Sequence, residues 1–273
     1  MPTPRALSTC PVEVWRGIRG VLTDIDDTLT TDGRITADVF SAMERLRASQ
    51  RLTIPITGRP AGWCDMIARQ WPVDAVVGEN GAFYFRYDRT RRRMVRCYAD
   101  PEHVRAENQL RLKAISVDIL AAVPGAGISA DQAYRETDLA IDLCEDVEPL
   151  PKRDIDDILD IFARHGATAK VSSIHVNGWF GNYDKLAMTK QLMLEQFSID
   201  LDREPERFVF AGDSPNDAPM FGFFPNAVGV ANLKIFLSQC DASPAWITRG
   251  ECGEGFVELV DRILGADEGP DPR

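Results

Sequence analysis

Three aspartates stand within four residues near the start of the chain, in the segment VLTDIDDTLT that covers residues 21–30. On an extended backbone, side chains two positions apart leave on the same side, so the carboxylates of Asp24 and Asp26 lie close together. Two like charges at that distance repel each other, and a divalent cation removes the penalty. Because the ligands on offer are all oxygens, the segment predicts a Mg²⁺ site at the C-terminal end of a strand, where open α/β sheets bind ligands.

Two other interpretations fit the same residues. Aspartates after a strand often cap the next helix or form a turn, and taken alone the segment fits that structure equally well. A calcium-binding EF-hand loop also begins with Asp-x-Asp, but it needs glycine at its sixth position and glutamate at its twelfth. Those positions hold Leu29 and Ile35, and a strand-like segment precedes the loop instead of a helix, which excludes the EF-hand.

The composition limits the class of protein. The chain has 273 residues, of which 44% are hydrophobic and 27% are charged, as in globular proteins with a sizeable core. The net charge of -11 argues against a general binder of nucleic acid or of anionic membranes, because phosphate contacts need clustered lysine and arginine. We therefore expect neither nucleic acid nor a membrane among the partners.

Cysteine and histidine usage indicates an intracellular protein without a zinc site. No two of the six cysteines have the Cys-x-x-Cys spacing, and the three histidines add no zinc pattern. The opening residues MPTPR lack the apolar core of a signal peptide, and no apolar run approaches the length of a membrane span. Reduced, mostly buried thiols and a cytoplasmic location are the expectation.

Short apolar strands alternate with helices at both ends of the chain. One strand is expected to end near residue 24, and others to cover 52–56, 74–77, 207–211, 227–230 and 245–248. Helices are expected at 36–49, from Pro60 onward, at 186–197 and at 254–264, with residues 1–16 as an arm. This alternation is typical of a parallel sheet with crossover helices, so the predicted fold class is α/β with a Rossmann-like core.

The pattern changes between these two halves. A hairpin is expected at 82–87 and 93–98, followed by a helix at 101–122, a strand at 138–143, an amphipathic helix at 154–165 and a strand at 168–176. We interpret this block as an inserted α+β cap domain at 85–180. The core then consists of 1–84 and 181–265, and 266–273 is expected to be a disordered tail.

Three of the predicted strands end in polar clusters, at 24–28, 57–59 and 212–217, and in a parallel sheet these ends share one edge. The clusters read Asp24-x-Asp26-x-Thr28, Thr57 and Gly212-Asp213-x-x-Asn216-Asp217, with a lysine after the insertion. They resemble the motifs of the haloacid dehalogenase superfamily of phosphohydrolases. The layout is similar to subfamily IIB, whose large type-two (C2) cap is found in sugar-phosphate phosphatases, although Asp27 stands where that family usually has glycine.

The resemblance implies roles for these residues. Asp24 is the expected nucleophile that forms an aspartyl-phosphate, and Asp26 is the expected acid that protonates the leaving oxygen and then activates water. Mg²⁺ is expected between Asp24, the backbone carbonyl of Asp26 and Asp213, where it offsets the repulsion between carboxylate and phosphate. Thr57 and Gly58 are expected to hold the phosphate oxygens.

A cation beside the nucleophile is also expected, because the loose transition state of phosphoryl transfer needs its charge stabilised. Lys185, which opens the helix after the insertion, is favoured for catalysis and phosphate binding, and Lys190 is its competitor. Asn216 and Asp217 are expected to orient water molecules bound to the metal. Arg59 is either structural or a partner of Asp217.

Together these expectations describe a Mg²⁺-dependent phosphatase that acts on a small phosphorylated metabolite, with a sugar phosphate as the favoured substrate. The cap is expected to close over the substrate and to exclude water. Two alternatives stay open: a phosphotransferase or phosphomutase that uses the same intermediate, and a catalytically silent binding protein on the same fold. A silent site has no reason to keep the full set of Asp24, Asp26, Thr57, Lys185 and Asp213.

Overall fold

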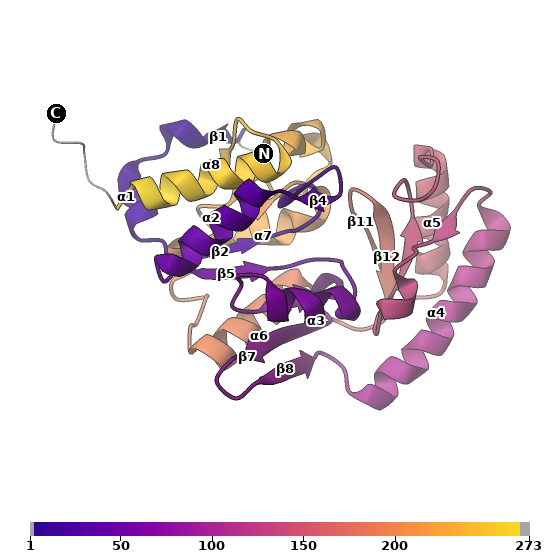
Figure 1. Cartoon of the computed structure of the whole chain (residues 1–273). Coiled ribbons are helices and arrows are strands. Elements are labelled where there is room, and N and C mark those ends of the chain that lie inside the picture. The colour runs from indigo at the N-terminus through magenta and orange to yellow at the C-terminus, as the bar shows by residue number, and fades with distance from the viewer. Residues whose placement is uncertain (1–2, 268–273) are drawn as a thin grey trace.

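Six parallel strands form the sheet at the centre of the larger of two lobes (Figure 1). In spatial order they are β1 (Arg5–Ala6), β15 (Trp246–Ile247), β14 (Val228–Gly229), β13 (Phe208–Gly212), β2 (Gly20–Thr23) and β5 (Leu52–Pro55). The computed structural model, which describes residues 3–267, confirms the parallel sheet predicted from the sequence. The central strands β2 and β13 pair so that Thr23 lies opposite Ala211, and the segments that follow both strands therefore start side by side.

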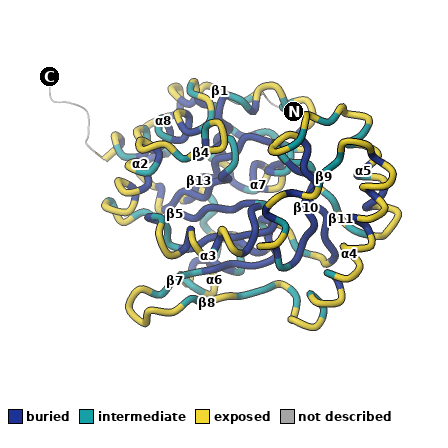
Figure 2. The backbone as a smooth tube through the Cα atoms, turned by 45° about the vertical axis from the view of Figure 1, so that its right-hand side comes forward, coloured by how far each residue is buried: buried dark blue, intermediate teal, exposed yellow. Residues whose placement is uncertain are grey.

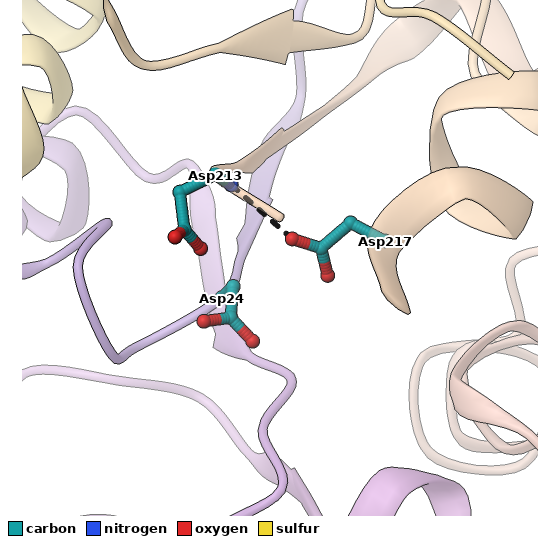
Figure 3. Close-up of side chains that lie close together, drawn as sticks. All are labelled: Asp24, Asp213 and Asp217. Carbon is teal, nitrogen blue, oxygen red and sulfur yellow. Dashed lines mark hydrogen bonds between the residues drawn. The ribbon is translucent and has the colours of Figure 1, made fainter. Parts of the chain in front are cut away.

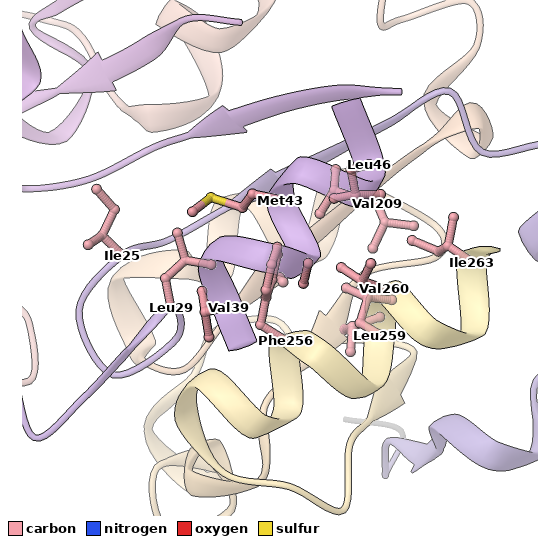
Figure 4. Packing of buried hydrophobic residues seen from close by; sticks show 14 of the residues in the cluster. Ile25, Leu29, Val39, Met43, Leu46, Val209, Phe256, Leu259, Val260 and Ile263 are labelled. Carbon is pink, nitrogen blue, oxygen red and sulfur yellow. The ribbon is translucent and has the colours of Figure 1, made fainter. Parts of the chain in front are cut away.

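Helices cover both faces of this sheet. They are α1 (Val12–Arg16), α2 (Ala37–Ala48), α3 (Ala61–Gln70), α6 (Lys185–Phe197), α7 (Ala218–Phe223) and α8 (Cys252–Gly265). Because neighbouring residues of a strand point to opposite faces, Val209 packs with α2 and α8 (Figure 4), whereas Phe208 and Phe210 pack with α6 and α7. Buried residues accordingly follow the strands and the inner sides of the helices (Figure 2). Within residues 3–267, no helix is both long enough and apolar enough to cross a membrane.

The N-terminal segment belongs to the core and is not the free arm expected from its composition. Strand β1 pairs with β15 at the edge of the sheet, and Leu7 and Trp15 are fully buried. Burying a side chain such as leucine stabilises the fold by about 1.5–3 kcal/mol, which is enough to hold a short segment. At the other end of the chain, Ala266 is buried and its carbonyl accepts a hydrogen bond from Arg16. Residues 268–273 of the expected tail lie outside the described residues.

The third expected strand, at 74–77, meets the parallel sheet through one parallel bridge, between Val77 and Ile56 just after β5. It pairs antiparallel within a separate sheet that consists of β6 (Val76–Gly78), β7 (Phe83–Asp88) and β8 (Arg93–Tyr98). Phe83, Tyr84 and Phe85 are all buried among residues of the larger lobe, so this sheet is part of the core. The boundary expected at residue 85 thus falls inside β7, and we place the start of the cap after β8. A further short hairpin, β3 (Thr30–Thr31) and β4 (Arg34–Ile35), follows the aspartate segment.

The smaller lobe, which we call the cap, lies beside the C-terminal edge of the parallel sheet (Figure 1). Its elements are α4 (Glu102–Ala122), β9 (Gly127–Ile128), β10 (Asp138–Asp142), α5 (Lys152–Arg164), β11 (Thr168–Val171) and β12 (His175–Trp179). The strands form an antiparallel sheet in the order β11-β12-β10-β9, and α4 and α5 pack on the face that points away from the core. The opposite, polar face of the cap sheet therefore looks toward the core.

The single strand expected at 168–176 is in fact a hairpin. The chain turns at 172–174, where the backbone N–H of Ser172 bonds to the carbonyl of His175 at 2.8 Å. The hairpin places Lys170 opposite Asn177. The serine-rich turn lacks the glycine or proline that usually marks a hairpin in a sequence, which explains why the pattern looked continuous.

Candidate active site

Three carboxylates converge at the C-terminal edge of the parallel sheet (Figure 3). Asp24 follows β2, Asp213 follows β13 and Asp217 lies just before α7. All three side chains are buried, and one oxygen from each lies within 4.8 Å of the others. The backbone explains their proximity, because the N–H of Asp24 bonds to the carbonyl of Ala211 at 2.9 Å and so holds the two strand ends together.

Lys185 brings a positive charge to these carboxylates. Its Nζ donates to Oδ1 of Asp24 at 2.6 Å and to Oδ1 of Asp217 at 2.8 Å, and only 4% of the side chain is exposed. Lys190 lies elsewhere, in a pair with Asp202 at 2.6 Å in which both side chains are partly exposed. Of the two lysines weighed from the sequence, Lys185 is therefore the one beside the carboxylates.

A left-handed turn at 79–81 sets where α6 begins. Gly81 has a φ of +103°, and a Cβ at this position would clash with the carbonyl oxygen of Asp184. Asp184 in turn caps α6, because its carboxylate accepts from the N–H of Ala187 at 2.7 Å. The close approach that glycine permits thus fixes the first turn of α6, and with it the position of Lys185.

Burial and crowded charge decide the protonation of this cluster. Burial raises the pKa of Asp24 to about 8, an effect that Lys185 opposes and that Asp217 reinforces. Burial, and next the charge of Asp24, raise the pKa of Asp213 well above its usual range. Burial alone would lower the pKa of Lys185. The negative charges of Asp217 and Asp24 have the larger combined effect and raise this pKa above its usual value. The site without a metal therefore holds more carboxylates than its lysine can neutralise.

The donor atoms fit a divalent cation. Oδ2 of Asp213 is buried and has no hydrogen-bond partner among residues 3–267, while Oδ1 accepts from the hydroxyl of Thr28 at 3.3 Å. Both oxygens of Asp217 are occupied, one by Lys185 and the other by the N–H of Asp213. Asp24 and Asp213 therefore offer the ligand oxygens, and Asp217 holds them in place. Oxygen ligands of this kind suit Mg²⁺.

The side chain of Asp26 lines the same small cavity as Asp24 and binds Arg59. Nε of Arg59 donates to Oδ1 of Asp26 at 2.9 Å, so Arg59 pairs with Asp26 and not with Asp217. The same guanidinium reaches the cap, where it donates to Glu145 at 2.7 Å and to Asp131 at 3.4 Å. These cap partners could not be read from the sequence, because no local pattern relates Arg59 to residues so far along the chain.

Thr57 and Gly58 follow β5, and Gly58 lines the small cavity at the site. Thr57 is fully buried, and its hydroxyl accepts from the backbone N–H of Arg59 at 3.0 Å, which turns the loop. A Cβ at Gly58 would lie 3.1 Å from Nδ2 of Asn80 and 3.4 Å from Oδ1 of Asn177. Because Gly58 has no side chain, the cap residue Asn177 can pack closely against the loop at 57–59, which is expected to bind phosphate.

The cap closes tightly over this edge. The cavity that reaches Asp24 and Asp26 measures about 10 Å³. It is lined by Asp24, Asp26, Gly58, Arg59, Ser214 and Asn216 of the core and by residues 172–175 and Asn177 of the cap. Such a volume holds about one water molecule and is too small for a phosphate group. The small cavity must therefore enlarge before a phosphate ester can reach Asp24. A second cavity between the lobes measures about 600 Å³ and shares Ser172, Ser173, Ser214 and Asn216 with it.

Glu79 joins the two lobes, and the sequence did not reveal this contact because residues 79–81 are predicted there only as a turn. Its buried carboxylate accepts from the backbone N–H of Ala61, at 2.9 Å, which begins α3. It also accepts from the N–H of Glu136 at 3.0 Å and from the N–H of Thr137 at 2.6 Å, and it bonds the Thr137 hydroxyl. One core side chain thus joins the start of a core helix to the cap. Burial, and next the charge of Asp138, raise the pKa of Glu79 to about 7.

We expect the Glu79→Gln variant to melt at a lower temperature than the wild type, because an amide N–H₂ would face donors that need an acceptor. The difference should depend on pH. A carboxyl whose pKa rises from 4.5 to about 7 on folding contributes most stability below pH 4.5 and loses it as the pH rises through 7. The melting temperatures of the two proteins should therefore differ more at pH 5 than at pH 8. Glu44→Gln, at an exposed position of α2, is the matched control, and a pH-independent difference would contradict the raised pKa.

The chain is similar in sequence to a known phosphatase and in fold to solved hydrolases. No family model matches the chain. The chain is 27% identical over 255 residues to a phosphoglycolate phosphatase from Haloarcula marismortui, an alignment that covers 88% of the chain and 95% of that protein. The sucrose-phosphatase from Synechocystis, solved with sucrose and phosphate, has a TM-score of 0.61 at 16% identity, and the match covers 90% of the chain and 98% of that structure. A haloacid dehalogenase-like hydrolase from Bacteroides thetaiotaomicron has a TM-score of 0.61 at 15% identity, over 90% and 99%.

Proposed function

We propose that the chain is a Mg²⁺-dependent phosphatase of the haloacid dehalogenase superfamily that hydrolyses a small phosphorylated metabolite through an aspartyl-phosphate, a proposal that its similarity to a phosphoglycolate phosphatase and to the fold of a haloacid dehalogenase-like hydrolase supports. One observation carries the proposal: the buried carboxylate of Asp24 lies 2.6 Å from the ammonium of Lys185, at the edge where Asp213 offers an unpaired oxygen. A nucleophile, a cation and a metal ligand are thus gathered at one point.

Asp24 is the nucleophile in the first half of the proposed reaction. A carboxylate oxygen of Asp24 forms a bond to phosphorus while the bond from phosphorus to the leaving oxygen breaks. Lys185 is already within hydrogen-bond distance of Asp24, so its charge stabilises the negative oxygens of the transferring phosphoryl group without rearrangement. Asp24 and Asp213 would hold Mg²⁺, which offsets the repulsion between the carboxylate and the anionic phosphate.

Asp26 moves the protons in both halves of the reaction. It donates its proton to the leaving oxygen, and the resulting carboxylate then takes a proton from the water that attacks the aspartyl-phosphate. That attack releases inorganic phosphate and restores Asp24. The bond from Arg59 to Asp26, at 2.9 Å, orients the carboxyl group for this role.

The proposed substrate class rests on the sequence and on the relatives. The sequence favours a sugar phosphate, and similar proteins include a phosphoglycolate phosphatase and a sucrose-phosphatase. We therefore propose a small soluble phosphate ester.

Phosphate release from a panel of about a hundred phosphorylated metabolites, with Mg²⁺ and with EDTA, tests this function. We expect release from a few related esters, and we expect EDTA to abolish it. Transfer of phosphate to added acceptor sugars, without net release, would instead identify a phosphotransferase. A protein that binds Mg²⁺ but releases phosphate from none of the esters would contradict the proposal.

A further inference from the structure

The larger cavity between the lobes adjoins the small cavity that Asp24 lines. It measures about 600 Å³, a volume in the range of binding sites for small molecules. The residues that the two cavities share come from only two segments, the turn between β11 and β12 and the segment that follows β13. A shift of these two segments would therefore join the cavities, and the small cavity has to enlarge in any case before a phosphate ester binds.

Apolar side chains form most of the wall of the larger cavity. The core contributes Phe236, and the cap contributes Leu143, Leu150, Ile155, Leu159, Ala169 and Val171. One side of each cap residue packs into the hydrophobic cluster of the cap, and Phe236 packs in the same way against the larger lobe. All of them except Leu143 are only half-buried, so part of their apolar surface stays open where they line the cavity.

The charged residues of the lining lie on the open side of the cavity. All four of them are exposed, namely Lys152, Asp156, Lys170 and Asp241. Nearer the catalytic end, the polar lining consists of the shared serines and Asn216, and the hydroxyl of Ser214 already donates to Oδ1 of Asn216 at 2.8 Å. Between these two ends, a ligand would contact mainly aliphatic groups.

An apolar alcohol fits this arrangement better than a sugar does. Moving apolar surface from water into such a cavity is favourable, and each buried methylene group strengthens binding about fourfold. The hydroxyl groups of a sugar would lose their hydrogen bonds to water without gaining partners on aliphatic walls. We propose that the larger cavity binds the alcohol part of the substrate, and that this alcohol carries an apolar chain or ring. The inference rests on the proposed function, since the phosphate end must reach Asp24, and it names the substrate class.

Two esters of matched length test the inference: hexyl phosphate and 5-hydroxypentyl phosphate. In the second ester, a hydroxyl group replaces the terminal methyl group, while the leaving oxygen and its neighbouring carbons are the same. We expect kcat/KM for hexyl phosphate to be at least about tenfold higher in the wild type, because the methyl group enters the apolar cavity without losing hydrogen bonds. The difference should come mostly from a lower KM.

Two variants locate the effect in the larger cavity. Val171→Thr places a hydroxyl group in its wall at nearly the same volume, and Ala169→Leu fills part of it. Each should lower the ratio of the two kcat/KM values several-fold. Val117→Thr is the matched control, because Val117 is 62% exposed on α4 and lines neither cavity, so the ratio should not change. Melting temperatures show that the variants compared are folded.

The outcomes separate this inference from the function on which it rests. A wild-type ratio below about threefold would overturn the apolar subsite, and so would a wild-type ratio in the folded cavity variants. In either case, Mg²⁺-dependent release of phosphate from p-nitrophenyl phosphate would leave the proposed phosphatase function intact. A wild-type protein that releases phosphate from none of the three esters would overturn both.

Discussion

The Asp24→Asn variant should release phosphate at least about a thousandfold more slowly than the wild type while keeping its fold. The substitution exchanges one oxygen for an NH₂ group and removes the nucleophile, and the amide cannot form the acyl-phosphate bond. The fold should tolerate the change, because burial raises the pKa of Asp24 to about 8 and a neutral side chain is already favoured there without a metal. Lys185 keeps its bond to Asp217 at 2.8 Å. Phosphate release and the melting temperature in EDTA measure the two effects.

Asp32→Asn is the matched control for this variant. Asp32 lies in the exposed turn between β3 and β4 with a φ of +50°, a conformation that asparagine also accepts. The control should therefore retain wild-type turnover and stability. Turnover within tenfold of the wild type in Asp24→Asn would contradict the aspartyl-phosphate mechanism. Unfolding of that variant in EDTA would contradict the raised pKa.

The strand ends show what a sequence can predict about this site. An apolar segment that is followed by a cluster of polar residues can be recognised locally in a sequence. Parallel pairing brings the C-terminal ends of such strands to one edge of the sheet, independently of the loops that connect them. The positions of Asp24, Thr57 and Asp213 at that edge follow from this rule alone. Lys185 also follows from local chemistry, since Asp184 caps α6 and so places the next residue in its first turn.

The contacts of Arg59 and Glu79 show where this kind of prediction ends. Arg59 binds Glu145, which stands 86 residues further on, and Glu79 binds Thr137, 58 residues further on. Such pairs depend on how the cap folds back over the core, and no periodicity encodes that path. The hairpin expected at 82–87 and 93–98 is present as β7 and β8, but the sequence assigned most of it to the cap. Phe83, Tyr84 and Phe85 are all buried, so their pattern does not show which lobe they pack against. Tertiary packing decides which sheet such a strand joins.

Replacing Lys185 with methionine should impair both stability and catalysis, whereas the same change at Lys190 should affect neither strongly. Lys185 is buried between Asp24 and Asp217, and its loss leaves buried carboxylates without a counter-charge, which typically costs about 3–5 kcal/mol. Lys190 is 32% exposed in its surface pair with Asp202, and such pairs contribute about 0–1 kcal/mol. Melting temperatures in EDTA and phosphate release with Mg²⁺ measure the two effects on the same helix.

The effect of Mg²⁺ on the Lys185→Met variant distinguishes the two roles of the lysine. If its structural role is to neutralise the carboxylates, added Mg²⁺ should raise the melting temperature of the variant more than that of the wild type, because the ion replaces the missing charge. Turnover should stay low even when stability returns, because the cation that stabilises the transferring phosphoryl group is still absent. Full recovery of turnover with Mg²⁺ would show that Lys185 acts only on stability. Loss of turnover in Lys190→Met, with Lys185→Met active, would reverse the assignment of the two lysines.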